Sequence, residues 1–250
     1  MASKDKNAQG LNLRSSGTKT SSVSDFWRLT RKRDALIVLL TLVTGAIDAI
    51  GLIKLGGVFT SVMTGNMVFL GISVARKNPI IAYHTFISLG GYVVGTLIGA
   101  KVAGHAEAEE ELWPRPIVMA LVVELGLISV SALWLELVSG KPSTGQTFFL
   151  LALNACALGV QGSAVLRFGI NGLSTTYLTG TLTLLLANFT KRKAASQMRS
   201  ALILLALIFG AAIGAILALH LPRLATLFPL VVLAVVIVTA EFIFHRKIQR

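Results

Sequence analysis

Long apolar stretches, separated by short polar or glycine- and proline-rich breaks, occupy most of the chain. A helix needs about 20 mainly apolar residues to cross about 30 Å of hydrocarbon, and these stretches have about that length. The pattern predicts an all-α, polytopic transmembrane helix bundle. Eight helices are expected, near residues 35–53, 58–75, 80–103, 116–138, 147–166, 172–190, 201–220 and 225–244.

The second half of this pattern echoes the first. A Thr-Gly-Asn sequence at residues 64–66 lies in one apolar stretch, and a Thr-Gly-Thr sequence lies 115 positions later in another. Such self-similarity predicts one membrane unit used twice, over residues 31–139 and 146–246, each unit containing four helices. Residues 1–30 hold few apolar groups, so they are expected to form a disordered, basic cytoplasmic tail.

The basic residues test the number of spans. With eight spans and a cytoplasmic tail, 18 of the 23 basic residues fall on the inner side, in agreement with the positive-inside rule. If the second and sixth stretches are instead re-entrant or broken, six spans remain. Arg76 and Lys77 then move outside, and the asymmetry is expected to fail. Eight spans imply parallel repeats and six imply inverted repeats.

Composition excludes several classes of protein. The chain is 54% hydrophobic and 14% charged, whereas soluble domains carry about 25% charged residues. Its net charge of +12 does not indicate nucleic-acid binding, because the basic residues cluster at the ends of apolar stretches. The sequence contains no Ser/His/Asp set, metal-ligand cluster or phosphate-binding loop, so neither an enzyme, a metal nor a cofactor is expected. The lipid bilayer is the expected partner.

Polar residues inside the apolar stretches form the candidate site. A charged residue at this depth costs about 2.5–3.5 kcal/mol on insertion scales and usually has a role. Rise along the helices predicts that Asp48, Thr64 and Glu124 share one layer of the outer half-membrane. Gln161 is expected to replace Asp48 in the second unit. The predicted substrate- or ion-binding residues are Asp48, Thr64, Gly65, Asn66, Glu124, Gln161, Thr179 and Gly180.

Each of these positions also has a purely structural interpretation. Asp48 can exchange a proton and couple transport, or it can accept hydrogen bonds from Thr64, Asn66 or a loop amide and lock two helices together. Glu124 can equally be a neutral carboxyl hydrogen-bonded within the bundle. A Thr-Gly pair can break a helix at a binding site or can serve packing alone.

Small residues at every fourth position predict close helix packing. One stripe lies in the third predicted helix and the other in the seventh, and the two are expected to form the central contact between the units. Their members are Gly91, Gly95, Gly99 and Ala103, and Ala206, Gly210, Gly214 and Ala218.

Three motifs carry a family resemblance: Gly45 to Ala49 (GAIDA), Leu55 to Phe59 (LGGVF) and Met63 to Asn66 (MTGN). In this order they resemble the signature of the YoaK family of bacterial membrane proteins, which has a domain of unknown function. The resemblance extends over about residues 31–245. It implies a polytopic protein of the bacterial inner membrane, and it implies no particular substrate or reaction.

The function best supported by these patterns is a secondary transporter or permease for a small solute or ion, with a polar intramembrane site and proton coupling. The alternative is a membrane scaffold or accessory subunit whose polar residues only hold helices together. An enzyme comes third. Both termini are expected in the cytoplasm, and the sequence specifies neither the solute nor the oligomeric state.

Overall fold

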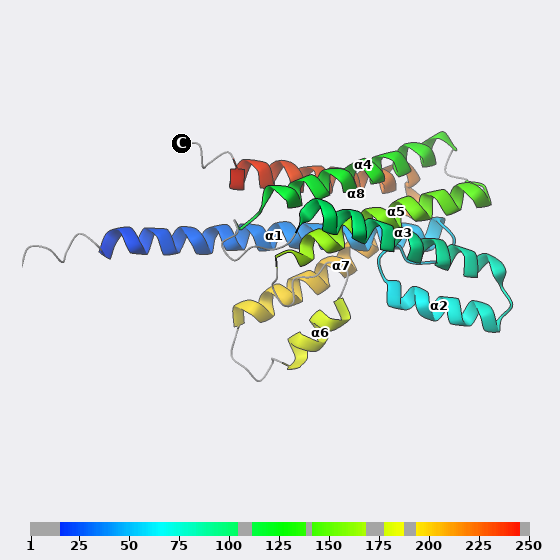
Figure 1. Cartoon of the computed structure of the whole chain (residues 1–250), viewed down its shortest axis with the longest axis horizontal. Helices are drawn as coiled ribbons and strands as arrows, with labels where there is room; N and C mark the ends of the chain where they lie inside the picture. Colours follow the sequence, from blue (N-terminus) through cyan, green and yellow to red (C-terminus); the bar gives the residue numbers. More distant parts are fainter. Residues whose placement is uncertain (1–15, 105–111, 139–141, 169–177, 188–193, 246–250) are drawn as a thin grey trace, which may run out of the picture.

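The computed structural model describes residues 16–104, 112–138, 142–168, 178–187 and 194–245, and all regular structure within them is helical (Figure 1). The helices are α1 (Ser16–Lys54), α2 (Met63–Ala75), α3 (Pro79–Ala103), α4 (Arg115–Leu137), α5 (Thr144–Leu166), α6 (Leu178–Ala187), α7 (Ala194–His220) and α8 (Pro222–Ala240). A π-helical turn, η1 (Glu241–His245), extends α8. The polytopic helical bundle predicted from the sequence is confirmed.

Six of these helices are long and apolar enough to cross a membrane. They are α1 from Asp25 onward, α3, α4, α5, α7 from Gln197 onward, and α8 with η1. In contrast, α2 has 13 residues and the described part of α6 has 10, which correspond to about 20 Å and about 15 Å. By length, the second and sixth helices therefore agree with the six-span alternative.

The bundle has two ends, which we name by residues of α1. At the Ser16 end α1 begins and η1 finishes, and at the Lys54 end α1 finishes and α8 begins (Figure 1). The helices α1, α4 and α7 run toward the Lys54 end, whereas α3, α5 and α8 run back. The short α2 lies at the edge of the bundle in this view. It starts partway between the two ends and runs to the Lys54 end, so α1 and α2 form a re-entrant hairpin.

This arrangement corrects the charge argument. Arg76 and Lys77 do lie at the Lys54 end, beside Lys54 and Arg223. However, Lys101, Arg115 and Arg167 lie at helix termini of the Ser16 end, where Arg28, Arg31, Lys32, Arg33 and Arg199 also gather. The prediction that six spans would destroy the charge asymmetry is wrong, because these three residues replace the basic residues that move away.

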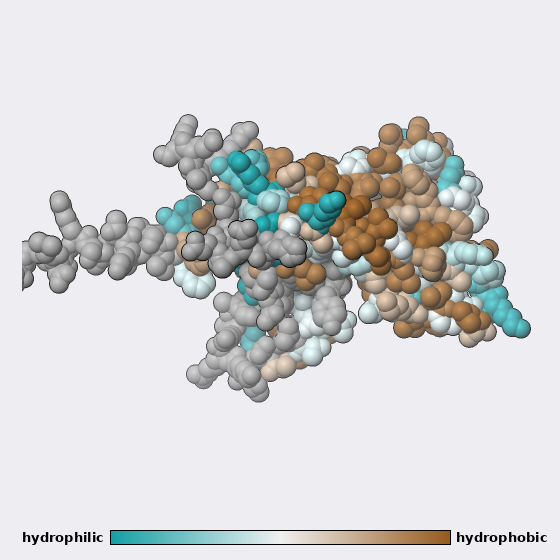
Figure 2. Space-filling view, in the orientation of Figure 1, coloured by the Kyte–Doolittle hydropathy of each residue, from teal (hydrophilic) through white to brown (hydrophobic). Residues whose placement is uncertain are grey.

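Large apolar side chains cover the outside of the bundle. Figure 2 shows hydrophobic residues over much of this face, with hydrophilic residues toward the ends. Leu97 on α3, Phe209 on α7 and Val231 on α8 are each 59% or more exposed. Such a surface is stable against lipid tails, whereas a soluble protein rarely exposes a large apolar patch.

The glycine stripes pack differently from the prediction. Helix α3 packs along α5, and α7 packs along α1, so the two stripes do not form a contact with each other. A Cβ at Gly95 would overlap the carbonyl of Cys156, and a Cβ at Gly210 would overlap that of Leu42. Their role in helix packing, together with Gly91, Gly99 and Gly214, is confirmed, because only glycine permits such close backbone approach.

The two close helix pairs share one contact pattern. Gly159 of α5 approaches Tyr92 of α3, and Gly45 of α1 approaches Leu207 of α7. Adding 114 to the α1 numbers and subtracting 115 from the α7 numbers converts this α1/α7 contact, and those of Gly210 and Gly214, into contacts of the α5/α3 pair. At this offset Gln161 matches Ile47, and Gly162 matches Asp48. The predicted match of Gln161 to Asp48 is therefore displaced by one residue.

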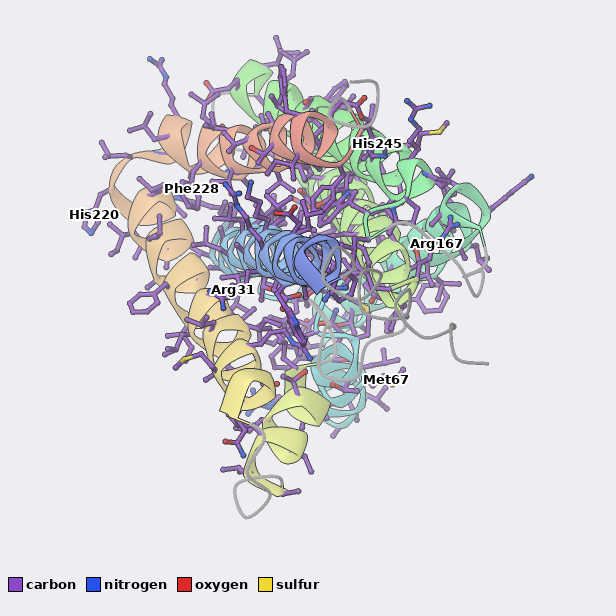
Figure 3. All side chains as sticks on the ribbon, turned by 90° about the vertical axis from the view of Figure 1, so that its left-hand side faces the viewer. Arg31, Met67, Arg167, His220, Phe228 and His245 are labelled. Carbon is purple, nitrogen blue, oxygen red and sulfur yellow. The ribbon has the colours of Figure 1, made fainter. Side chains whose placement is uncertain are left out.

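Helix α1 lies at the centre of the bundle when the molecule is viewed from the Ser16 end (Figure 3). Its helix begins at Ser16, so residues 16–30 of the predicted tail are helical, which contradicts predicted disorder for them. Adding a residue to an existing helix is much easier than nucleating a new helix. The helix of the spanning part of α1 therefore continues into this polar segment. The first 15 residues lie outside the described residues.

A clamped re-entrant segment and an unpaired carboxyl

Residues 55–62 connect α1 to α2 without helical structure. Gly56 and Gly57 have φ angles of 99° and 74°, in the left-handed region that favours glycine, and they turn the chain back into the bundle. Beyond them Val58, Thr60 and Ser61 are buried. The sequence predicted a helix from residue 58, but helix α2 begins only at Met63. Non-helical backbone at membrane depth requires hydrogen-bond partners from the protein.

Asp48 supplies most of these partners. Its Oδ1 accepts hydrogen bonds from the Thr60 amide at 2.8 Å, the Thr60 hydroxyl at 2.9 Å and the Ser61 amide at 2.8 Å. Its Oδ2 accepts the Ser61 hydroxyl. Four donors therefore surround one carboxylate that is 5% exposed. The interpretation of Asp48 as an acceptor for loop amides is confirmed, with Thr60 and Ser61 as the partners in place of Thr64 and Asn66.

Asn66 and Ser88 fix the residue just before this clamp. The Asn66 Oδ1 accepts the Phe59 amide at 3.0 Å, and its Nδ2 donates to the Phe59 carbonyl at 2.7 Å. Ser88 of α3 donates to the same carbonyl at 2.6 Å. We name Asp48, Asn66, Ser88 and the residues 59–61 that they hold the Asp48 clamp. It explains why α1, α2 and α3 meet at this point.

The Thr-Gly pairs lie outside the clamp. Thr64 on α2 and Thr179 on α6 are both exposed, so neither shares a buried site with Asp48. A Cβ at Gly65 would lie 3.3 Å from the Phe59 ring, so this glycine is a packing position. Gly180 is half-buried on α6. The predicted grouping of Thr64 with Asp48 is wrong, because the helix places Thr64 and the inward-facing Asn66 on different faces.

Gln161 lies toward the other end of the bundle, about 8 Å before α5 ends at the Ser16 end. It is fully buried, and its amide nitrogen Nε2 donates to the Thr44 hydroxyl at 2.7 Å. Its Oε1 has no hydrogen-bond partner among the described residues. Gln161 therefore joins α5 to α1 and does not contribute to the Asp48 clamp.

Glu124 has the least compensated position of the predicted residues. Its side chain is fully buried in α4, and neither carboxyl oxygen has a hydrogen-bond partner among the described residues. It lies about 14 Å from the start of α4 at the Ser16 end, whereas Asp48 lies about 9 Å from the Lys54 end. The predicted common layer in the outer half-membrane is therefore wrong, since α4 runs in the same direction as α1.

The structure adds polar residues that the sequence interpretation missed. A cavity of about 30 Å³ lies between α1, α4, α5 and α8, and its lining includes Ser131, Asn154, Thr226 and Pro229. Asn154 donates to the Ser131 hydroxyl at 2.7 Å. An asparagine and a proline within apolar stretches were the available signals, because both normally require compensation inside a membrane.

Metal binding finds no support in these residues. In the described segments, no group of three or more His, Cys, Asp or Glu side chains could hold a metal ion. The polar groups that remain are amides, hydroxyls and the two buried carboxyls. Their chemistry suits hydrogen bonding, proton exchange or weak binding of a small polar species.

Comparison with known proteins gives a family. The family described as "Protein of unknown function (DUF1275)" matches residues 36–239. A similar relative, "UPF0700 transmembrane protein YoaK" of Bacillus subtilis (strain 168), is 34% identical over 160 residues, which cover 64% of this chain and 68% of the relative. No solved structure matches the chain. The family match reaches all six long helices and includes the clamp and Glu124, and the chain belongs to this YoaK-type family of transmembrane proteins.

Proposed function

We propose that the protein is a secondary transporter for a small solute or ion, and that Glu124 carries the proton that couples the movement. The supporting observation is the unpaired, fully buried carboxyl of Glu124 in a spanning helix. An uncompensated charge there would be strongly unfavourable, so Glu124 holds its proton in the packing observed here. It can release the proton when water or a charged partner approaches the carboxyl. Buried carboxyls that can both hold and release a proton are characteristic of proton-coupled membrane proteins.

The re-entrant hairpin supports the same proposal. Transporters place their sites where interrupted helices from two related halves meet, commonly with the halves inverted in the membrane. Here α2 and the described part of α6 are both short, and the α1/α7 and α3/α5 contacts correspond. The matched helices α1 and α5 run in opposite directions. We therefore propose two inverted repeat units, each with three spanning helices and one short helix.

Charge supports an orientation for this bundle. The described basic residues concentrate at the Ser16 end, so the positive-inside rule assigns that end to the cytoplasm. We propose a bacterial plasma-membrane location with both termini cytoplasmic and the Lys54 end outside. The proposal includes neither an enzymatic reaction nor a cofactor.

A flux assay in lipid vesicles tests the proposal. Purified protein is reconstituted with a pH-sensitive dye inside, and a panel of metabolites and ions is added outside. At least one solute is expected to drive proton movement in the wild type. Glu124→Gln keeps the size of the side chain but cannot lose a proton, so it is expected to abolish solute-driven proton movement while the protein remains folded.

Glu136→Gln is the matched control, because Glu136 lies on the same helix with a side chain that is 45% exposed. This variant should transport like the wild type. Two results would contradict the proposal: no solute moves protons through the wild type, or Glu124→Gln retains full coupling. The scaffold alternative expects no solute-driven flux in any of the three proteins.

A further inference from the structure

The cavity between α1, α4, α5 and α8 leads from the Lys54 end toward Glu124. It has a neighbouring hollow of about 20 Å³, which shares Ile50, Leu135 and Thr226 with it. Lys54 and Pro222, the last residue of α1 and the first of α8, line this second hollow. Together the two hollows extend from the end of the bundle inward to Ser131 and Asn154.

One face of α4 continues this route. Leu135, Ser131 and Ile128 line the cavity, and Glu124 follows Ile128 by four residues toward the Ser16 end. Residues spaced by three or four positions lie on one helix face, so these four residues form a single stripe. Ser131 is about 10 Å from Glu124 along the helix axis. Ile128, which is 3% exposed, therefore separates the cavity from the carboxyl.

The cavity lining is suited to water. Asn154 uses its amide hydrogens on the Ser131 hydroxyl and on the Leu150 carbonyl, the latter at 2.8 Å, so its Oδ1 remains as an acceptor. Pro229 lies inside α8 and lacks the amide hydrogen that would bond the Ala225 carbonyl. A buried water needs a cavity of roughly 10–15 Å³ and two to four polar partners. The hollows, of about 30 Å³ and about 20 Å³, therefore have room for a short chain of waters.

The described residues on the Ser16 side of Glu124 are closely packed. On the Ser16 side of Glu124, Leu121, Ala120 and Ile117 of α4 are fully buried in the apolar core. Beyond them Trp113 stacks on Phe244 with ring centroids 5.8 Å apart. Between Ile117 and Leu121, α4 offers Glu124 no polar side chain, whereas Ser131 lies on the cavity side.

We infer that the two hollows form a proton inlet, in which waters held by Ser131, Asn154, Thr226 and the Ala225 carbonyl connect the Lys54 end to Glu124 past Ile128. A hydronium in the cavity gives its proton to the Glu124 carboxylate, leaving a water and a neutral carboxyl. The helices packed on α4 carry few other side chains that could take or release a proton. These are Cys156 on α5, Arg223 on α8, and Tyr83, His84, Tyr92 and Lys101 on α3. The inlet rests on the proposed role of Glu124.

Hydrogen–deuterium exchange of the Glu124 carboxyl tests the inlet without any transport assay. Full-length protein in lipid is mixed with heavy water, and the infrared C=O band of the protonated carboxyl, identified by its loss in Glu124→Gln, is followed in time. Ile128→Ala removes the separating side chain and should speed exchange several-fold. Ala132→Leu fills the cavity and should slow exchange several-fold. Val130→Leu adds bulk on the exposed face of α4 and should leave the rate unchanged.

The outcomes separate the two proposals. Absence of a Glu124 carboxyl band would overturn the proposed role of Glu124 and the inlet with it. A Glu124 band whose exchange is no faster in Ile128→Ala would overturn the inlet alone, and this holds even if Ala132→Leu does not fold. Faster exchange in Ile128→Ala, with an unchanged rate in Val130→Leu, supports the inlet.

Discussion

Asp48 and Glu124 are carboxyl groups buried in spanning helices of one bundle, and their surroundings are opposite. Asp48 accepts hydrogen bonds from two amides and two hydroxyls of the returning segment. Glu124 has no hydrogen-bond partner among the described residues. Burial of a carboxyl in a membrane is therefore insufficient to mark a transport site. The number of hydrogen-bond donors around each carboxyl is what separates the structural role of Asp48 from the role proposed for Glu124.

Removal of the Asp48 carboxylate should have the largest effect on stability. In Asp48→Ala the Thr60 and Ser61 amides stay buried without an acceptor, and each unpaired group costs roughly 1–3 kcal/mol. The free energy of unfolding should fall by about 2–6 kcal/mol. Thermal unfolding of the purified protein measures it, with exposed Glu136→Ala as the control. Stability equal to the wild type would show that Asp48 does not hold the segment.

Asn66→Leu should weaken the same clamp by a smaller amount. The Phe59 amide loses its acceptor, but Ser88 still donates to the Phe59 carbonyl. We expect a loss of about 2 kcal/mol, since one buried donor remains unpaired. Thr64→Val changes an exposed residue of the same helix and should alter stability by less than about 0.5 kcal/mol. Equal losses in the two variants would contradict the division of α2 into a clamped and an exposed face.

Glu124→Leu should have the opposite sign. It replaces an unpaired carboxyl with an apolar side chain of similar size, so the protein should become more stable by about 1.5 kcal/mol. The same unfolding assay applies, and Asp48→Leu is the informative partner because it should be strongly destabilising. A destabilised Glu124→Leu would mean that Glu124 has a stabilising partner, and the contrast between the carboxyls would disappear.

Gln161→Leu should have the smallest effect of the four. Its Nε2 hydrogen bond to Thr44 is lost, but the Thr44 hydroxyl keeps its own acceptor, the Leu40 carbonyl at 3.1 Å. With no donor left unpaired, the loss should be about 0.5–1 kcal/mol. Thr44→Val leaves the buried Gln161 Nε2 with only the Leu40 carbonyl at 3.4 Å, so it should cost about 1–3 kcal/mol, more than Gln161→Leu. A loss as large as that of Asp48→Ala would place Gln161 among the structural clamps.

The sequence predicted the helices well, because long apolar runs and glycine stripes depend on local composition. It also selected Asp48, Asn66, Glu124 and Gln161, all of which are buried. It placed the start of the second helix at residue 58, whereas α2 begins at Met63, since Val58 and Phe59 are apolar and favour inclusion in the span. Hydrogen bonds from residues distant in the sequence stabilise that segment: Asp48 on the preceding helix, Asn66 on α2 and Ser88 on α3.

The direction of the later helices also escaped prediction. Basic residues occur in similar number at the alternative loops, so Lys101, Arg115 and Arg167 could replace Arg76 and Lys77 without changing the asymmetry. If α2 is a full span, α4 is predicted to run in the opposite direction to the one observed, and Glu124 is predicted in the wrong half of the bundle. Asn154 and Thr226 were overlooked because their common cavity depends on the packing of α5 against α4 and of α8.

Infrared spectroscopy of the wild type, Glu124→Gln and Asp48→Asn in lipid at neutral pH tests the central contrast most directly. The C=O stretch of a protonated carboxyl is separate from the bands of a carboxylate, so the spectrum reports which side chain carries a proton. We predict a protonated carboxyl band that disappears in Glu124→Gln and remains in Asp48→Asn. A band that disappears in Asp48→Asn and remains in Glu124→Gln would contradict the account.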